Sequence, residues 1–395
     1  DVAGLTRYTE HTLERLLNWQ IVRLNGSLED LMEAPVLYMS GNTAWQFEQE
    51  EIQKLREYCF RGGMIVTVAD KGSREFTDAM QNLAKEAFSE FPLRALSPEH
   101  PLFAAEVQFA IDKPPVIYEV NNGLRTLMLI CADDIAATWA RGKGRKEHLE
   151  LGVNIYNYAT DKTSVRSRLE TAEIPAKDVE IQRKIEVALI QHKGNWNPEP
   201  YGWTRLKNYM NNETRTRILL WPGIKLDDKS LRDFKVAYIT GAEALELSEE
   251  EFDGLRSFLR RGGTLLADAA GGSREFRESL ERYVSEMLSV REHRVPADSY
   301  LITGEGISDS VKLNELGYNR SGRSRVSGPA APLYAYESGR RLAVVYSPLD
   351  LSEALLGTHV YGSAGYDGPS ALRVMRNLLL YADLPSREKA ALERD

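Results

Sequence analysis

The stretch LRRGGTLLADAAGGSREF, residues 259–276, decides the fold of this chain. It reads as the end of a helix, a glycine pair, a buried strand and a tight turn that opens a second helix. Residues 59–76, CFRGGMIVTVADKGSREF, spell almost the same element earlier in the sequence. The chain therefore carries one strand-and-helix unit twice.

The similarity extends far beyond this element. Residues 36–66 align without a gap to residues 236–266, and residues 121–136 resemble residues 337–352. The other matched pairs are Leu5 with Leu206, Tyr8 with Tyr209, Asn154 with Asn377 and Tyr158 with Tyr381. So many matches in one order indicate a tandem duplication.

Each copy alternates short apolar runs with amphipathic helical stretches, which is typical of a sheet covered on both faces. Right-handed strand–helix–strand crossovers then predict two duplicated doubly wound, flavodoxin-like or Rossmann-like, parallel-sheet domains. We expect the first repeat over residues 1–162, a charged linker over 163–183 and the second repeat over 184–395.

The two copies differ at their starts. The second copy begins with the apolar run KIEVALIQ, residues 184–191, which is followed by residues 192–214. The first copy begins within its equivalent of residues 192–214, and no run equivalent to KIEVALIQ precedes it. We therefore expect that the chain is cut from a longer one, or that its first sheet borrows a strand.

Composition excludes several classes of protein. The formal net charge of −8 disfavours nucleic acid as a partner, and no stretch has the ~20 apolar residues that span a bilayer. Cys59 and Cys131 lie in apolar contexts and are expected to be buried thiols. The six histidines are scattered without metal-ligand spacing, so we expect no metal and no cofactor.

The runs HKGNWNPEPYGWTRLKNYM (192–210) and VAYITGAEALELSEEEFDGLRSFLRRGGTLLADAAGGSREF (236–276) resemble the bacterial family called domain of unknown function 4159. The resemblance covers residues 184–385, and a weaker version covers 1–162. It implies a fold similar to class I glutamine amidotransferases, an extracytoplasmic location and no established activity. The nucleophilic cysteine of those enzymes is missing from both strand-to-helix turns, and the family's histidine position falls on Asn42 and Ala242.

The turns still offer candidate sites. Asp268, Ser273 and Arg274 are the residues of a hydrolase or transferase alternative. The groups Gly272-Ser273-Arg274 and Gly72-Ser73-Arg74 could instead cradle an anion at a helix start. In the plainer interpretation, which we favour, each serine caps its helix and the arginine makes a surface ion pair.

Two loops could contact a partner. The first is basic through Arg141, Lys143 and Arg145, and the second carries Tyr361 and Tyr366. We therefore expect a non-catalytic binding or assembly module with a protein or glycan partner, its two repeats packed about a pseudo-twofold axis. Whether it is an enzyme is left open, because this type of scaffold hosts many functions.

Overall fold

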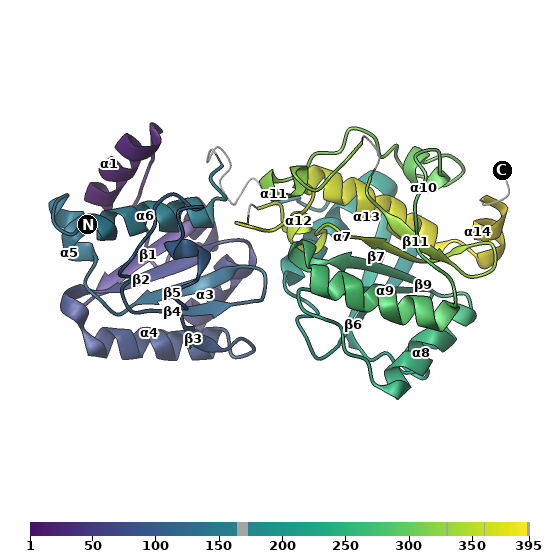
Figure 1. The fold of residues 1–395 in the computed structure, drawn as a ribbon, viewed down its shortest axis with the longest axis horizontal. Coiled ribbons are helices and arrows are strands. Elements are labelled where there is room, and N and C mark those ends of the chain that lie inside the picture. Colours follow the sequence, from purple (N-terminus) through teal and green to yellow (C-terminus); the bar gives the residue numbers. More distant parts are fainter. Residues whose placement is uncertain (164–172, 329–330, 359, 393–395) are drawn as a thin grey trace. The chain divides into compact units, whose positions relative to one another are not determined.

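The computed structural model describes residues 1–163, 173–328, 331–358 and 360–392 (Figure 1). The chain forms two compact units, and the division along the sequence falls between Glu173 and Ile174. Each unit is a sheet with helices on both faces, so the expected α/β fold class is confirmed. Part of the expected linker, residues 164–172, lies outside the described residues.

The first unit contains a five-stranded sheet of order β1-β2-β5-β4-β3. Its strands are β1 (Val36–Gly41), β2 (Met64–Ala69), β3 (Leu93–Ala95), β4 (Ile117–Asn121) and β5 (Thr126–Cys131). Its helices are α1 (Val2–Leu13), α2 (Leu28–Leu31), α3 (Gln49–Phe60), α4 (Arg74–Ala87), α5 (Ala136–Arg141) and α6 (Lys146–Ala159). Apolar side chains of α3 and α4 cover one face of the sheet, and those of α1, α5 and α6 cover the other.

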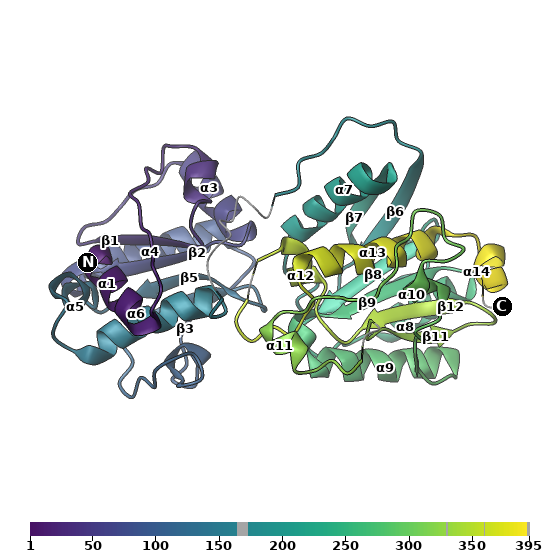
Figure 2. The same cartoon turned by 90° about the horizontal axis from the view of Figure 1, so that it is seen from above.

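The second unit contains a seven-stranded sheet of order β10-β11-β12-β9-β8-β6-β7. Its strands are β6 (Arg183–Ile190), β7 (Thr216–Ile224), β8 (Val236–Gly241), β9 (Thr264–Ala269), β10 (His293–Arg294), β11 (Tyr334–Glu337) and β12 (Leu342–Ser347). Its helices are α7 (Pro200–Thr214), α8 (Glu249–Arg260), α9 (Arg274–Leu288), α10 (Tyr300–Thr303), α11 (Arg320–Arg323), α12 (Ser352–Leu356), α13 (Gly368–Asp383) and α14 (Ser386–Leu392). Helices α7, α12 and α13 lie over one face, and α8 and α9 lie over the other (Figure 2).

The sheets are parallel over most of their width, and each has antiparallel pairing at one side. The strands β1, β2 and β5 are parallel, whereas β4 pairs antiparallel with β5 and β3 pairs antiparallel with β4. In the second sheet, β11 pairs antiparallel with β12 of the parallel set, and β10 pairs antiparallel with β11. A hairpin needs no crossover helix, because antiparallel neighbours can be joined by a short turn.

The two sheets agree strand for strand over most of their width. The order β1-β2-β5-β4-β3 corresponds to β8-β9-β12-β11-β10, and β6 and β7 are additional to the second sheet. Helices α1 and α7 both end at a residue in left-handed conformation, Glu14 and Arg215, in the register given by the Leu5–Leu206 alignment. Among the described residues of the first unit, no strand corresponds to β6 or β7.

Asparagines at equivalent positions of the two repeats make equivalent hydrogen bonds. The Asn154 side chain donates to the carbonyls of Leu102 and Phe109, both at 2.8 Å, and accepts from the Phe109 amide at 3.0 Å. Asn377 makes the same three bonds to Leu301 and Val311, at 2.7–2.9 Å. A buried amide that satisfies three backbone groups explains why both copies carry asparagine in an apolar helix.

The glycine pairs end helices α3 and α8 as expected. Gly62 and Gly262 have φ of 108° and 103°, a region open to glycine at little cost. A buried arginine then secures each turn, because Arg125 and Arg341 each donate at 3.0 Å to the carbonyl of the second glycine of the pair. Each arginine also donates to a carbonyl in the last turn of the helix, that of Cys59 or Leu259, and so bonds a group that the helix end leaves unpaired.

Candidate functional site

The carboxyl ends of the parallel strands in the second unit bring several polar side chains together. Tyr238 comes from β8, Asp268 from β9, and Asp350 and Ser352 from the segment that follows β12. All four are buried, and the two aspartates have no exposed surface. In open α/β sheets, ligands bind at this edge, so this cluster is the first place to look for a site.

Asp268 is bonded on both carboxylate oxygens by its own chain. The Tyr238 hydroxyl donates to Oδ1, and the amides of Leu351 and Ser352 donate to Oδ2 at 2.9 and 3.2 Å. Burial raises the pKa of Asp268 above its ordinary value, while these hydrogen bonds act in the opposite direction. The side chain ties three strand ends together within the core.

Asp350 performs a second bridging task. Its Oδ1 accepts from the amides of Glu353 at 2.7 Å and Ala354 at 3.2 Å, at the start of helix α12. Its Oδ2 accepts from the Gly271 amide at 2.5 Å. Burial, together with the Asp268 carboxylate, raises the pKa of Asp350 to about 8. An internal carboxyl group thus binds at the strand-to-helix turn where an external anion would bind.

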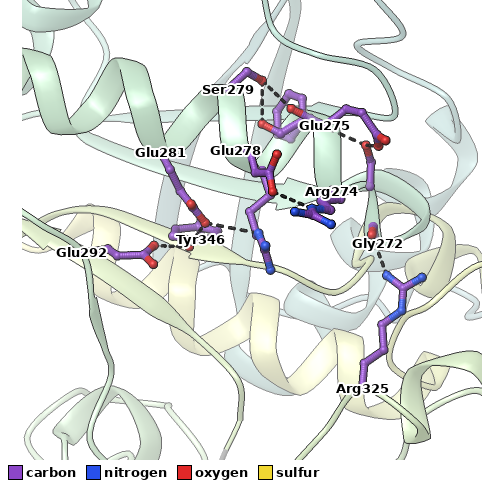
Figure 3. A network of polar contacts seen from close by, with 12 residues as sticks. Gly272, Arg274, Glu275, Glu278, Ser279, Glu281, Glu292, Arg325 and Tyr346 are labelled. Atoms are coloured by element: carbon purple, nitrogen blue, oxygen red, sulfur yellow. Dashed lines mark hydrogen bonds and ion pairs between the residues drawn. The ribbon is translucent and has the colours of Figure 1, made fainter.

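Gly271 and Gly272 form that turn with positive φ, at 65° and 73°. The guanidinium of Arg325 donates to the Gly272 carbonyl at 2.7 Å, and the Ala364 amide donates to the Gly271 carbonyl at 3.0 Å (Figure 3). A Cβ on Gly272 would come within 2.9 Å of both Arg325 and Ala364. Side chains and backbone of the same repeat therefore close the turn from outside.

Ser273 is a helix cap. Its Oγ accepts from the Phe276 amide at 3.2 Å, as the plainer interpretation predicts, and donates to Glu275 at 3.3 Å. Arg274 points along the helix to Glu278 at 2.5 Å, and its side chain is 76% exposed (Figure 3). Of the three residues of the enzyme alternative, Asp268 is in the core and Arg274 is at the surface.

The first repeat has the same turn with a different cover. The Ser73 hydroxyl caps α4 through the Phe76 amide at 3.3 Å and donates to the Asn42 carbonyl at 2.9 Å. The nearest atom to a Cβ built on Gly72 is 3.7 Å away, and Arg74 lies 3.8 Å from Asp78 on the helix surface. Gly72 is exposed where Gly272 is buried, so this turn is open.

Asp70 lies at the open turn and is partly buried. Burial and the neighbouring Asp134 raise its pKa above the ordinary value. Asp134 corresponds to Asp350 and caps α5 in the same way, by accepting from the Ala137 amide at 3.0 Å. The first repeat therefore keeps the counterpart of Asp350 in a more solvated setting, while Val68 stands where the second repeat has Asp268.

The partner-loop residues separate into two groups. Arg141, Lys143 and Arg145 are exposed in the short connection between α5 and α6. Tyr361 is half-buried, and Tyr366 is buried with a tilted ring contact to Tyr318 at 5.2 Å. The expectation that Tyr366 projects toward a partner is wrong, because its loop folds inward to cover the Gly271 turn.

Sequence reasoning missed His192, which follows β6. Its Nε2 donates to the Thr240 carbonyl at 2.8 Å and its Nδ1 accepts from the Gly194 amide at 3.2 Å. Burial lowers the pKa of His192, which keeps the ring neutral. Its position at the end of an apolar strand could have indicated a buried histidine, but nothing in the sequence indicates that the ring bonds to the Thr240 carbonyl.

A second missed group lies beside the turn. The Tyr346 hydroxyl contacts the carboxylates of Glu281, at 2.7 Å, and Glu292 (Figure 3). Burial and the two carboxylates raise the pKa of Tyr346 well above its ordinary value, and burial also raises that of Glu281. These residues come from β12, α9 and the segment before β10, far apart in the sequence.

Among the residues that the structure describes, no group of three or more His, Cys, Asp or Glu side chains is arranged to hold a metal ion. Cys59 and Cys131 are both buried and form no disulfide, as expected. In the described part of the chain, none of the helices combines the length and apolar character needed to cross a bilayer.

Comparison with protein families gives one match. The family described as Domain of unknown function (DUF4159) matches residues 2–160 and again residues 186–382. The chain therefore belongs to this family and carries its domain in tandem. No curated protein shows a significant match to the chain.

Proposed function

We propose that this tandem member of the family is a non-catalytic binding or assembly module. The observation that carries the proposal is the bond from the Gly271 amide to the Asp350 carboxylate. Because this amide already donates to the chain's own carboxyl group, it cannot serve as a donor to a substrate anion.

The neighbouring groups support the same conclusion. The Ser273 hydroxyl accepts from the Phe276 amide as a helix cap, and the base that it contacts is the solvent-exposed carboxylate of Glu275 at 3.3 Å rather than the imidazole of a serine–histidine pair. Arg325 closes the turn from outside. These are the contacts of a structural joint rather than of a reaction centre.

The binding surface is the basic connection between α5 and α6. Arg141, Lys143 and Arg145 are exposed there on a chain of net charge −8. A local basic patch on an acidic protein attracts anionic groups on a partner and repels most other acidic surfaces. We therefore assign the partner an acidic protein surface or an anionic glycan.

Cross-linking of the full chain in extracts of its source organism tests this assignment. The variant Arg141→Glu, Lys143→Glu, Arg145→Glu is expected to lose the cross-linked partner at least tenfold. The matched control reverses the exposed residues Lys85, Arg94 and Lys113 of the same unit and is expected to retain it. Equal loss in both variants, or in neither, would refute a role for the basic connection.

A hydrolase or transferase at the second repeat is the second candidate. Its supporting observation is the pair of fully buried carboxyl groups of Asp268 and Asp350 at the carboxyl ends of the parallel strands, where burial raises the pKa of both. A panel of ester, amide and phosphoester substrates tests it, with Asp350→Asn compared against Arg282→Ala at an exposed position on α9. Turnover that Asp350→Asn abolishes and Arg282→Ala leaves unchanged would favour the enzyme and overturn the binding module.

A further inference from the structure

The outer edge of β1 differs from the equivalent edge of β8. In the second unit, β8 lies between β9 and β6, and β6 joins it in parallel through Val187–Val236, Ala188–Ala237 and Leu189–Tyr238. In the first unit, β1 joins β2 in the register that β8 has with β9, and no strand among the described residues joins its other side. One row of backbone amides and carbonyls is thus left without ladder partners.

Burial of the two strands reflects this difference. Every residue of β8 is buried, whereas only Leu37 and Met39 of the six β1 residues are. A parallel strand is normally covered on both faces, so the partial burial of β1 indicates that its cover is incomplete. The first sheet is thus incomplete at β1.

The segment after α1 gives an independent indication. In the second unit, the residues after α7 form β7, which pairs with β6 along its whole length. In the first unit, the residues after α1 form no strand, and they expose Leu16, Trp19 and Ile21 by 95%, 51% and 87%. Three large apolar side chains exposed within six residues mark a surface that a partner normally covers.

The second unit also shows what kind of segment could pair with the outer edge of β1. Strand β6 places Ile185, Val187 and Leu189 in the core on the α7 side, and Ala188 and Ile190 in the core on the α8 side. The first unit has the same two cores, one under α1, α5 and α6 and the other under α3 and α4. The matching occupant is therefore an extended segment that is apolar on both faces.

The connection from β6 to α7 specifies how such a strand enters. Only residues 191–199 separate the end of β6 from the start of α7. We propose that the outer edge of β1 is a docking site for one parallel strand with the apolar pattern of β6, which enters through the amino end of α1. The strand would separate β1 from residues 15–23 and pair with both. This inference does not depend on the proposed function.

Hydrogen exchange of the full chain tests the edge directly. The β8 amides, paired on both sides, serve as the internal reference, and we expect the β1 amides to exchange at least tenfold faster. Equal protection of β1 and β8 in the unaltered chain would overturn the proposal.

A fusion then tests the occupant. A copy of residues 183–198 placed directly ahead of Asp1 is expected to slow exchange in β1 and in residues 16–21 at least tenfold and to leave β8 unchanged. The matched control carries the same copy with Val187→Asp and Leu189→Asp and is expected to give no protection. Equal exchange in the fusion and in the control would refute the docking site. The same segment is also added as a separate peptide at equimolar concentration, and protection equal to that in the fusion would refute entry through the amino end of α1.

Discussion

Replacing Asp268 with alanine removes the acceptor of three buried donors at once, besides that of the Ser352 hydroxyl, which has the Thr240 hydroxyl as a second partner. The Tyr238 hydroxyl and the amides of Leu351 and Ser352 all bond to this carboxylate, which has no exposed surface. If the residue is a structural joint, its loss destabilises the second unit. If it is catalytic, its loss leaves stability unchanged or increases it, because catalytic groups often cost stability.

The expected size follows from the number of donors. A buried donor left without an acceptor costs about 1–3 kcal/mol, so three would cost about 3–9 kcal/mol. The Asp268 carboxylate is itself destabilised by burial, as its raised pKa indicates, so we expect the lower end of that range, about 3 kcal/mol. For a unit of this size, about 2–4 °C per kcal/mol gives a decrease in Tm of roughly 6–12 °C.

Differential scanning calorimetry of the full chain measures this decrease. Asp268→Asn keeps one acceptor oxygen, so its Tm should fall between those of wild type and Asp268→Ala. Arg274→Ala, at an exposed position on α9, should lie within about 2 °C of wild type. An Asp268→Ala protein with unchanged or higher Tm would refute the structural role and revive the catalytic one.

Three further predictions concern titratable groups. The folded pKa of Asp350, about 8, lies above its ordinary value of 3.8, so the folded state binds more protons between these pH values. Stability should therefore fall as pH rises from about 4 to 8, and urea unfolding of Asp350→Asn should show a weaker fall. Lys389 is buried against Thr264, and burial lowers its pKa to about 7 from 10.5, so the unfolded chain binds more protons above pH 7. Stability should rise from pH 7 to about 10 in wild type, and a Lys389→Met chain that keeps this rise would contradict the assignment. Burial raises the pKa of Cys131 to about 12, so iodoacetamide should label it at pH 8 only after unfolding, and rapid labelling of the native chain would show the thiol to be accessible.

Internal repetition made most of the fold predictable. Local patterns such as the Gly62-Gly63 pair, the serine caps and the apolar strand runs appear twice, so each copy tests the interpretation of the other. The antiparallel strands were not predictable in the same way. Strands β3 and β10 have only three and two residues, too short for a period-two pattern to be recognised.

The closure of the second-repeat turn could not be predicted from sequence. Arg325 and Asp350 reach the Gly271–Gly272 turn from segments more than fifty residues away. The sequence around Arg325 and Asp350 does not indicate that either residue contacts this turn, because an arginine in a polar insertion usually faces solvent. The burial of Tyr366 was missed for the same reason, since only the tertiary path of its loop brings it against Tyr318.

The comparison of the two turns argues for divergence after duplication. The equivalent aspartates Asp134 and Asp350 both cap the short helix that follows their strand. In the second repeat, Arg325 and Ala364 also pack onto the turn, and Gly272 is buried, whereas Gly72 remains exposed. A shared catalytic task would require both turns to keep an accessible donor set, but Gly72 is exposed and Gly272 is buried. If the proposed function holds, the duplicated element is a rigid scaffold in both copies, and the features that differ between them, the basic connection and the incomplete sheet edge of the first repeat, are where binding should be sought.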